Sequence, residues 1–582
     1  MEIDIHLENP YFPWTKTEGN NLKCWLKGDL LYKDTLLEGP GIISLFSSLP
    51  SSSGMNHDAL KDLLVDFKGC FALVIETREG LLCVVDRIRS IPLFYAKIDT
   101  RFIISDDANY IRDQINPLFN KNNGAEFLVT GYVTGPETLF DEIYQIRGGQ
   151  YLSYSGTDCH ITTSFYHRFW HEDFFPDSEE ELMKCLDEVF VHVFQRLIAS
   201  TKGKGLQIIV PLSGGLDSRI IIAMLKRLGV DNVICFSYGK KGNHEAEISK
   251  KVAEALGYQW YFVEYTNDKW FQCRHSEEMS AYERYAGNLA SLPHVQDFLA
   301  LQELQKEGKI PKKSVFIPGH CGNLIAGDCL PKKILEIPPN NDQFITFALH
   351  EHYLLWPWNE RGGEELEILF RRKIQQAVGK IAIHNAESLA NVIEYFNGNE
   401  RQAKFIVNSV RVYEFFGYAW KIPLWDAEDF FLRVPLKYRM RYGDNYLYII
   451  YAKKVLFTDN RKKLWDIDCT TKLQYNPNKT FKKKCENIID NNKLLKKCWH
   501  QYYFFKRRKF AFNKESNAHF GMIAKEKLST FFTGKEFPAS FLTMSYLEKF
   551  IPSPLDLIGI KKTFINFFGQ RLPGIPLIKS AI

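Results

Sequence analysis

The stretch Ser213-Gly214-Gly215-Leu216-Asp217-Ser218 decides the fold of this 582-residue chain. An apolar run over residues 206–212 precedes it and predicts a buried strand, and residues 216–228 predict a helix that begins inside it. A strand that enters a serine and glycine turn and then a helix forms an anion site. Glycines allow close approach, several N–H groups converge, and the helix dipole adds positive potential. The stretch therefore predicts an anion-binding loop.

Asp217 indicates which anion this loop binds. A carboxylate in the turn would repel a bare phosphate, whereas a pyrophosphate that carries Mg²⁺ brings the metal against it. We therefore predict Asp217 as a metal ligand. The other loop residues are predicted to bind the pyrophosphate of ATP: Ser213, Gly214, Gly215, Leu216 and Ser218. The alternative is an ordinary strand–turn–helix with a polar tip.

The spacing of these residues resembles that of the PP-loop ATP pyrophosphatases, which cleave ATP to AMP and pyrophosphate. It differs from a Walker loop, which would need a Gly-Lys-Ser/Thr ending.

Length and composition indicate a globular protein of two or three domains. The chain has 45% hydrophobic and 25% charged residues, as folded proteins do, and it is too long for one core. It contains no run of 18 apolar residues, which argues against a membrane span, and residues 1–6 lack a signal-peptide pattern. The twelve cysteines include no Cys-x-x-Cys pair, which disfavours zinc and fits a reducing compartment. We therefore expect a cytoplasmic protein.

The pattern of residues changes twice along the chain. Residues 1–170 are rich in short β-type runs. Residues 180–457 alternate strands with helices and become mostly helical beyond about 340, which favours a doubly wound parallel sheet with its ligand outside the carboxyl ends of the strands. Residues 458–582 form an extension without an assigned role. The runs predicted as strands are 70–75, 80–85, 102–105, 206–212, 233–238, 259–265 and 315–317, and the helices between the later ones are 216–228, 244–256 and 294–307.

The extension contains a basic stretch at 479–511 in which lysines and arginines alternate with aromatic residues. Such a stretch could bind a polyanion: nucleic acid, an anionic membrane surface or a nucleotide-activated substrate. A helix with a solvated basic face is the alternative, and the lack of a nucleic-acid-binding signature favours it. Nucleic acid is therefore not an expected partner.

Over most of residues 60–457 the chain resembles the asparagine synthetase family. Residues 69–72 and 86–95 are similar to its glutaminase-type domain, an α/β/β/α fold of the N-terminal-nucleophile type, and 134–140 and 146–149 to later turns of that domain. In the synthetase part, residues 213–218 match the PP-loop. Residues 236–245 and 252–257 are similar to the family's second strand and the helix that follows it. Residues 421–426 are similar to its "R-V-P-F-L-D" segment. Because that second strand packs near adenine, the resemblance adds Phe236 to the nucleotide site.

The N-terminal nucleophile is the first departure from the family. Glutamine-using members expose a cysteine directly after the initiator methionine, whereas this sequence has Glu2 there and its first cysteine is Cys24. A carboxylate cannot replace a thiol activated by its own α-amine. We therefore expect an inactive glutaminase-type domain, as in β-lactam synthetase-like members.

The second pyrophosphate turn, "S-G-E-G-S-D-E" in the family, is the second departure. Residues 318–324 match it, with Gly319 as a further pyrophosphate contact. His320 replaces a glutamate given a base-like role, so it is the candidate general base, with a turn-capping role as the alternative. Asn323 replaces the metal-binding aspartate and would be a weaker Mg²⁺ ligand, for which Asp328 could compensate.

The third departure is the family's catalytic lysine, in a "G-K-x-x-K" stretch. Residues 442–448 match that region and contain no lysine; the nearest cations are Arg439, Arg441, Lys453 and Lys454. Losing such a charge costs about 10²–10³ in rate, so either another cation takes the role or catalysis is compromised.

The resemblance implies an ATP-dependent ligase with ATP and Mg²⁺ as cofactors. A substrate carboxylate would attack the α-phosphorus to give an acyl-adenylate, and ammonia or another amine would displace AMP. The expected partners are thus a small carboxylic acid and an amine or ammonia, with a homodimer left open. One alternative is a non-catalytic nucleotide-binding scaffold, which the departures favour and the intact Asp217 disfavours. Another is a PP-loop enzyme acting on tRNA, which only the basic stretch favours.

Overall fold

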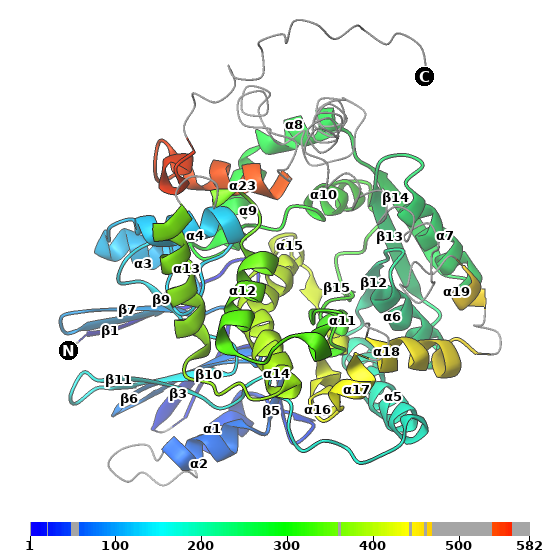
Figure 1. Ribbon diagram of the computed structural model, residues 1–582, viewed down its shortest axis with the longest axis horizontal. Helices are drawn as coiled ribbons and strands as arrows, with labels where there is room; N and C mark the ends of the chain where they lie inside the picture. The colour runs from blue at the N-terminus through cyan, green and yellow to red at the C-terminus, as the bar shows by residue number, and fades with distance from the viewer. Residues whose placement is uncertain are drawn as a thin grey trace, which may run out of the picture.

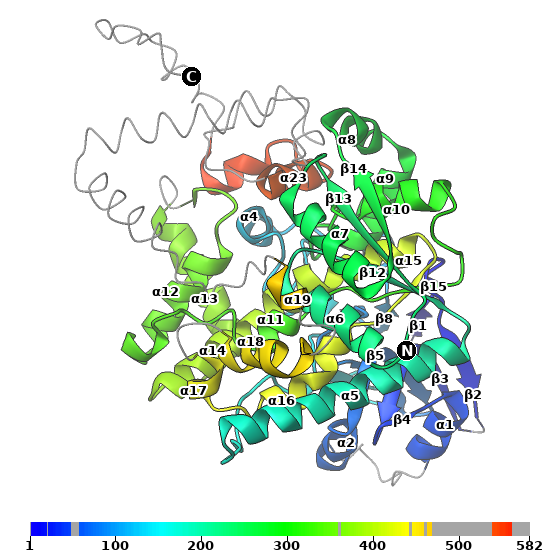
Figure 2. The same ribbon diagram turned by 90° about the vertical axis from the view of Figure 1, so that its right-hand side faces the viewer.

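The computed structural model describes most of the chain up to residue 458 and two later segments. Figures 1 and 2 show an N-terminal part in blue and cyan beside a parallel sheet in green, with further helices in yellow-green and yellow. The basic stretch at 479–511 lies outside the described residues. These are 2–19, 21–47, 57–358, 363–440, 445–458, 463–467 and 538–560.

The N-terminal part is a sandwich of two sheets. Its strands are β1 Glu2–His6, β2 Thr15–Glu18, β3 Leu22–Tyr32, β4 Thr35–Leu36, β5 Phe67–Thr77, β6 Gly80–Val85, β7 Phe94–Ile98, β8 Arg101–Ser105, β9 Tyr144–Gln145, β10 Gln150–Ser155 and β11 Ile161–Phe165. The smaller sheet has the order β1-β8-β7-β9, and the larger has the order β11-β10-β6-β5-β3-β2 with β4 beside β3. Helices α1 (Gly39–Ser47) and α2 (His57–Leu64) lie on the larger sheet, and α3 (Ala108–Ile115) and α4 (Lys121–Thr130) lie on the smaller one (Figure 1). The predicted α/β/β/α arrangement is confirmed.

Alternation along β5 shows why the two sheets stack. Phe71 and Leu73 belong to the cluster that contains Leu60 of α2, whereas Ala72 and Val74 belong to the core on the other face of the sheet. Successive side chains of a strand point to opposite faces, and here both sets are apolar. The larger sheet is therefore covered on both sides.

The second sheet is parallel throughout, with the order β14-β13-β12-β15-β16. Its strands are β12 Gln207–Pro211, β13 Val233–Gly239, β14 Gln259–Glu264, β15 Ser314–Phe316 and β16 Ala419–Trp420. Helices α6 (Leu216–Arg227) and α7 (His244–Leu256) cover one face, and α10 (Phe298–Lys306) lies on the other (Figure 2). The chain order reverses between β12 and β15, and ligands of such sheets bind outside the carboxyl ends at this switch point. Residues 213–218 leave β12 there.

The predicted doubly wound sheet is thus confirmed, with one helix start displaced. The helix expected at 294–307 begins at Phe298, because the main chain before it is held by the N-terminal part: Leu292 N donates to Gly131 O at 2.7 Å. Two helices before it, α8 (Asn267–Arg274) and α9 (Glu277–Gly287), were not predicted. Each begins at a hydroxyl cap, Thr266 and Ser276, whose side chain accepts a main-chain N–H three residues on.

The remaining described elements are mostly helical. The α-helices are α5 Glu179–Gly203, α11 Gly322–Ile325, α12 Asn341–His352, α13 Gly363–Val378, α14 Ala386–Asn397, α15 Arg411–Phe415, α16 Glu428–Phe431, α17 Leu436–Arg439, α18 Tyr446–Tyr451, α19 Lys463–Asp466 and α23 Pro538–Leu547. The π-helices are η3 Gly398–Ile406 and η7 Ala452–Leu456, and the 3₁₀-helices are η1 Ile334–Glu336, η4 Val407–Val410, η5 Pro423–Ala427 and η10 Pro554–Ile558. Helix α23 lies beside α4 (Figure 1), where Thr543 Oγ1 donates to Leu128 O at 3.1 Å. The helices in the described ranges are too short or too polar to cross a bilayer.

A buried ion network joins the N-terminal part to η3. Glu400, with 0% of its surface exposed, accepts hydrogen bonds from Lys404 Nζ at 2.6 Å, Arg147 Nη2 at 3.0 Å and the main-chain N–H of Gly135 at 3.0 Å. Burial lowers the pKa of Lys404 to about 8 although Glu400 favours its charged form. Two buried cations therefore share one carboxylate.

We expect Glu400→Gln to lower the free energy of unfolding by about 3–5 kcal/mol, because Arg147 would stay charged without a buried counter-ion, and Lys404, whose pKa Glu400 raises, would be driven toward its neutral form. Urea unfolding followed by tryptophan fluorescence measures this loss. The matched control is Glu336→Gln, which removes an exposed pair with Lys333 and should cost less than about 1 kcal/mol. Equal losses of unfolding free energy in the two variants would contradict the assignment of Glu400 as the shared buried counter-ion.

Candidate functional site

Hydrogen bonds within the first loop hold its two serines together. Ser213 N donates to Ser218 Oγ at 3.2 Å, the two hydroxyl oxygens are 3.1 Å apart, and Gly215 N donates to Ser213 Oγ at 3.1 Å. Gly215 is the N-cap residue of α6 and has no side chain to cap the helix. The first N–H groups of α6, from Leu216 onward, are therefore left for a ligand, as in an anion site.

Asp217 lies where the loop meets two other segments. Its carboxylate Oδ1 accepts a hydrogen bond from the hydroxyl of Tyr448 at 2.9 Å, and it also accepts the main-chain N–H of Asn323. Burial nevertheless raises the pKa of Asp217 to about 7, and the nearby carboxylate of Asp328 acts in the same direction. A carboxylate whose charged form is disfavoured in this way is stabilised by a nearby cation. Asp217 and its neighbours therefore fit a magnesium ion that also binds phosphate oxygens.

Glycines in the second turn allow it to lie directly against Asp217. A Cβ on Gly319 would lie 2.9 Å from Ser218 N, and one on Gly322 would lie 2.7 Å from Asp217 Oδ1. Any side chain at either position would therefore have to displace the loop. The structure thus brings both predicted pyrophosphate turns together at the carboxyl ends of β12 and β15.

The polar residues of the second turn face different neighbours. Asn323 Oδ1 accepts a hydrogen bond from Asn445 Nδ2 at 3.2 Å, and Asn323 O accepts the main-chain N–H of Asp328 at 2.9 Å. The side chains of Asn323 and Asp328 are both exposed, and both residues lie near Asp217. Among the described residues there is no group of three or more His, Cys, Asp or Glu side chains able to hold a metal. Any metal here would therefore depend on Asp217, neutral oxygens and phosphate.

His320 turns toward η4 and away from the first loop. Its Nε2 lies 2.7 Å from Ser409 Oγ. Burial, together with the neighbouring His294, lowers its pKa to about 4, so the imidazole is neutral at pH 7 but weakly basic. The next residue, Cys321, has φ of +71°, a conformation that glycine adopts more readily, at a position where the family motif has glycine. Its Sγ accepts a hydrogen bond from Gln402 at 3.2 Å.

Phe236 lies in the core with 1% of its surface exposed. Its ring packs against that of Phe316, with 6.1 Å between the two ring centroids. Its carbonyl oxygen accepts the N–H of Leu212 at 2.8 Å, which ties the end of β12 to β13. Its side chain is therefore part of the core, and its carbonyl is engaged within the sheet.

The cations considered for the missing lysine are engaged elsewhere. Arg439 is buried and pairs with Glu394 and Glu387, Lys454 Nζ lies 3.8 Å from Glu179, and Lys453 Nζ lies 5.2 Å from the centre of the Trp465 ring. Arg441 lies outside the described residues.

Sequence reasoning missed two residues that touch the loop. Tyr448 lies within the stretch searched for a lysine, and only the fold shows that its hydroxyl meets Asp217. Arg219 directly follows the motif and has 0% of its surface exposed. A charged residue before the apolar run at 220–225 was the signal that could have identified it.

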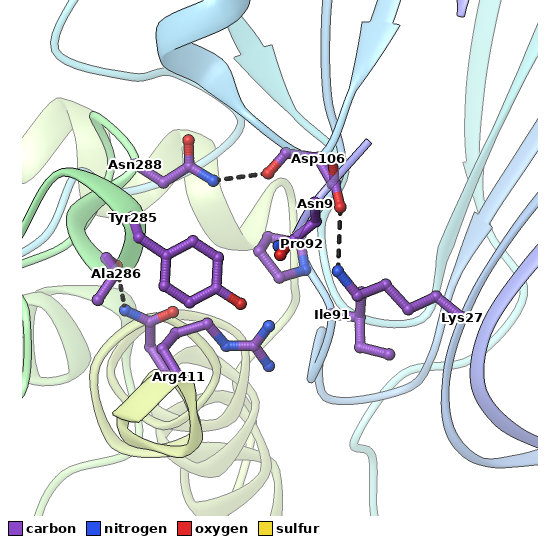
Figure 3. A pocket seen from close by; sticks show the side chains of 10 residues that line it. Asn9, Lys27, Ile91, Pro92, Asp106, Tyr285, Ala286, Asn288 and Arg411 are labelled. Carbon is purple, nitrogen blue, oxygen red and sulfur yellow. Dashed lines mark hydrogen bonds and ion pairs between the residues drawn. The ribbon is translucent and has the colours of Figure 1, made fainter. Parts of the chain in front are cut away.

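A separate polar hollow lies where the N-terminal part meets the synthetase part (Figure 3). Lys27 pairs with Asp106 at 3.0 Å, Asn288 Nδ2 donates to Asp106 O at 2.8 Å, and Tyr285 and Arg411 line the opposite side. The two predicted turns do not line this hollow, and its charged groups have partners within the protein. It therefore belongs to the interface between the two parts.

The described N-terminal part offers no thiol at the start of β1. Glu2 begins this strand with its side chain 70% exposed and 3.7 Å from Arg101. Cys24 lies on β3, is fully buried, and has a pKa raised by burial. A buried thiol with a raised pKa is a poor nucleophile.

Comparisons with known proteins agree with this arrangement. The family model described as asparagine synthase matches residues 204–403, and the glutamine amidotransferase domain model matches residues 56–170. A probable glutamine-hydrolysing asparagine synthetase of Acanthamoeba polyphaga mimivirus is 29% identical over 98 residues, which are 16% of this chain and 17% of the relative. The chain thus spans less than a fifth of that relative's length.

Two solved structures are similar at a low level. One is the glutamine phosphoribosylpyrophosphate amidotransferase from B. subtilis, at 11% identity over 44% of this chain and 73% of the other, with a TM-score of 0.19. The other is described as the allosteric regulatory enzyme of purine biosynthesis, at 10% identity over 43% and 62%, with a TM-score of 0.18. Scores this low carry no argument. Residues 204–403 of this chain are thus similar to asparagine synthase, and residues 56–170 are similar to a glutamine amidotransferase domain.

Proposed function

We propose that this chain is an ATP-dependent, AMP-forming carbon–nitrogen ligase. A substrate carboxylate attacks the α-phosphorus of ATP, pyrophosphate leaves, and ammonia or an amine then displaces AMP to form an amide. The family matches support an amide ligase of the asparagine synthase type. The acid, the amine and the acyl-adenylate belong to this proposal.

Each loop residue has a defined task in this reaction. Ser213, Ser218 and the N–H groups at the start of α6 would hold the pyrophosphate, and Gly319 would complete its cradle from the second turn. Asp217 would hold Mg²⁺, with Asn323 as a weaker neutral ligand, and the ion supplies charge neutralisation on the phosphates. His320, neutral at pH 7, would accept a proton from the attacking amine.

The partly buried carboxylate of Asp217 carries this proposal. A pKa of about 7 shows how much burial opposes its charge, and Gly319 and Gly322 bring the second turn to within contact of it. A fold without a cation at this place would be more stable with an apolar residue there. The retention of the carboxylate favours a metal–pyrophosphate site.

A non-catalytic nucleotide-binding scaffold is the second candidate. The pairing of Arg439 and Lys454 with glutamates favours it, because neither is then positioned to replace the family's lysine. The scaffold predicts nucleotide binding without exchange of pyrophosphate into ATP, so the exchange experiment described next separates the two candidates.

We expect acid-dependent exchange of pyrophosphate into ATP, tested with a panel of carboxylic acids that includes aspartate and uronic acids. Asp217→Asn should reduce the exchange by about 10²–10³, because the variant loses a charge that acts on the reacting phosphates. The matched control is Asp231→Asn, whose carboxylate is exposed and pairs only with Lys226 in the described contacts. Exchange that survives in Asp217→Asn, or Mg-ATP binding without exchange on every acid, would contradict the ligase.

Tyr448→Phe tests the hydrogen bond that favours the charged form of Asp217. Its loss raises the pKa of Asp217 above about 7, so more of the carboxyl is protonated at pH 7. We expect about a tenfold weaker Mg-ATP affinity at pH 7 by calorimetry. The affinity should recover near pH 9, where Asp217 is deprotonated in both the variant and the wild-type protein. Tyr446→Phe, which loses a hydroxyl donating to Glu179, is the control. Equal affinities at pH 7 would exclude this role for Tyr448.

We also propose that the N-terminal part does not hydrolyse glutamine, because Glu2 is at the start of β1 and Cys24 is buried. Purified protein should release no glutamate from glutamine, while ammonium salts should support amide formation. Glutamate release that disappears in Cys24→Ser would overturn this proposal.

The organisation of the molecule is proposed on the same grounds. We propose a glutaminase-type domain over residues 1–170, a synthetase domain over 180–457 and an extension over 458–582. A small carboxylic acid and an amine or ammonia are the proposed partners. A cytoplasmic location and a homodimer stay predictions.

A further inference from the structure

We propose that Arg219 is a positioning residue that couples the segment 463–467 to the conformation of the pyrophosphate loop. The proposal rests on the proposed function for its ligand, Mg-pyrophosphate. Its structural part, a coupling between two segments about 245 residues apart, is independent of that function.

Arg219 bridges the loop and the late segment with one guanidinium. Its Nη2 donates to Gly214 O at 3.1 Å, and its Nη1 donates to Leu464 O at 2.6 Å and Ile467 O at 2.9 Å. The side chain has 0% of its surface exposed, as does that of Leu464. These contacts use the planar fork of a guanidinium, which a lysine ammonium cannot reproduce.

The bond to Gly214 sets the orientation of one peptide group in the loop. A trans peptide holds its C=O and N–H in opposite directions, and no described peptide is cis. When Arg219 holds Gly214 O, the N–H of Gly215 must point the other way, toward Ser213 Oγ at 3.1 Å. The N–H groups at the start of α6 would bind an anion on the same side of the loop as the N–H of Gly215.

The bond from Gly215 N to Ser213 Oγ holds the other end of the same peptide group. Gly214 and Gly215 have wide conformational freedom, so their peptide could turn over without a steric penalty from a Cβ. On the other side, Gly214 packs near Glu245 Cα and Ile248 of α7, at 3.5–3.6 Å from where its Cβ would be. The segment 463–467 thus keeps Arg219 in place, and Arg219 keeps the peptide in its anion-binding orientation.

Amide hydrogen exchange on the full chain tests the coupling without any ligand. Arg219→Met should speed exchange both at 213–217 and at 463–467, and Arg219→Lys should do the same because it keeps the charge but loses the fork. Leu464→Asp perturbs the late segment without touching the loop, so it should speed exchange at 213–217 as well. Arg227→Met, at the other end of α6 and paired with Asp187, is the matched control and should leave both segments unchanged.

Calorimetry with Mg-pyrophosphate supplies the functional readout. We expect Arg219→Met and Leu464→Asp each to weaken its affinity by about tenfold or more, with Arg227→Met unchanged. Unchanged exchange at 213–217 in Leu464→Asp, or wild-type exchange in Arg219→Lys, would overturn the coupling, and Leu464→Asp decides the question should Arg219→Met fail to fold. Failure of the wild-type protein to bind Mg-pyrophosphate would refute the proposed function, while the exchange data would still decide the coupling.

Discussion

Partial burial of the Asp217 carboxylate costs free energy, and the topology of the parallel sheet places this residue where two turns meet. Strands β12 and β15 are neighbours, so the turns that leave their carboxyl ends must meet, and the glycines at 319 and 322 let them meet in contact. Asp217 lies at this meeting point, with Tyr448 and the main chain of Asn323 as hydrogen-bond donors. Those donors offset part of the cost and a cation would offset more. The arrangement of both turns around one charge is what gives the proposed ligase its physical basis.

The second turn also ties the nucleotide site to the rest of the molecule. His320 and Cys321 contact Ser409 and Gln402, which lie on η4 and η3. The same π-helix carries Glu400, whose partners include Arg147 and Gly135 of the N-terminal part. A change at the interface therefore acts on the element that supports the second turn. The N-terminal part therefore contributes to this support whether or not it catalyses a reaction.

Local patterns predicted the elements of the parallel sheet well because those elements depend on local properties. β12 is apolar from Ile208 to Pro211 since both its faces are covered there, and the glycine after α7 marks its end with a left-handed conformation. Helix α8 was missed although Thr266 caps it, because its apolar residues show little helical periodicity. Helix α9 was missed although Ser276 caps it. The start of α10 was predicted too early because a contact with the N-terminal part, Leu292 to Gly131, decides it.

The sequence by itself determined the doubly wound sheet and the loop at 213–218, because strand and helix periods and turn chemistry depend on neighbouring residues. The α/β/β/α sandwich followed from the resemblance to a family. It also placed Gly319 and Asn323 in a second turn through a family motif. Only the tertiary structure decided that Tyr448 meets Asp217, that His320 faces Ser409, and that Arg219 holds Gly214 together with Leu464. These partners are between 89 and 245 residues apart, apart from the bond from Arg219 to Gly214. No local pattern specifies such pairs, because the packing of whole elements brings them together.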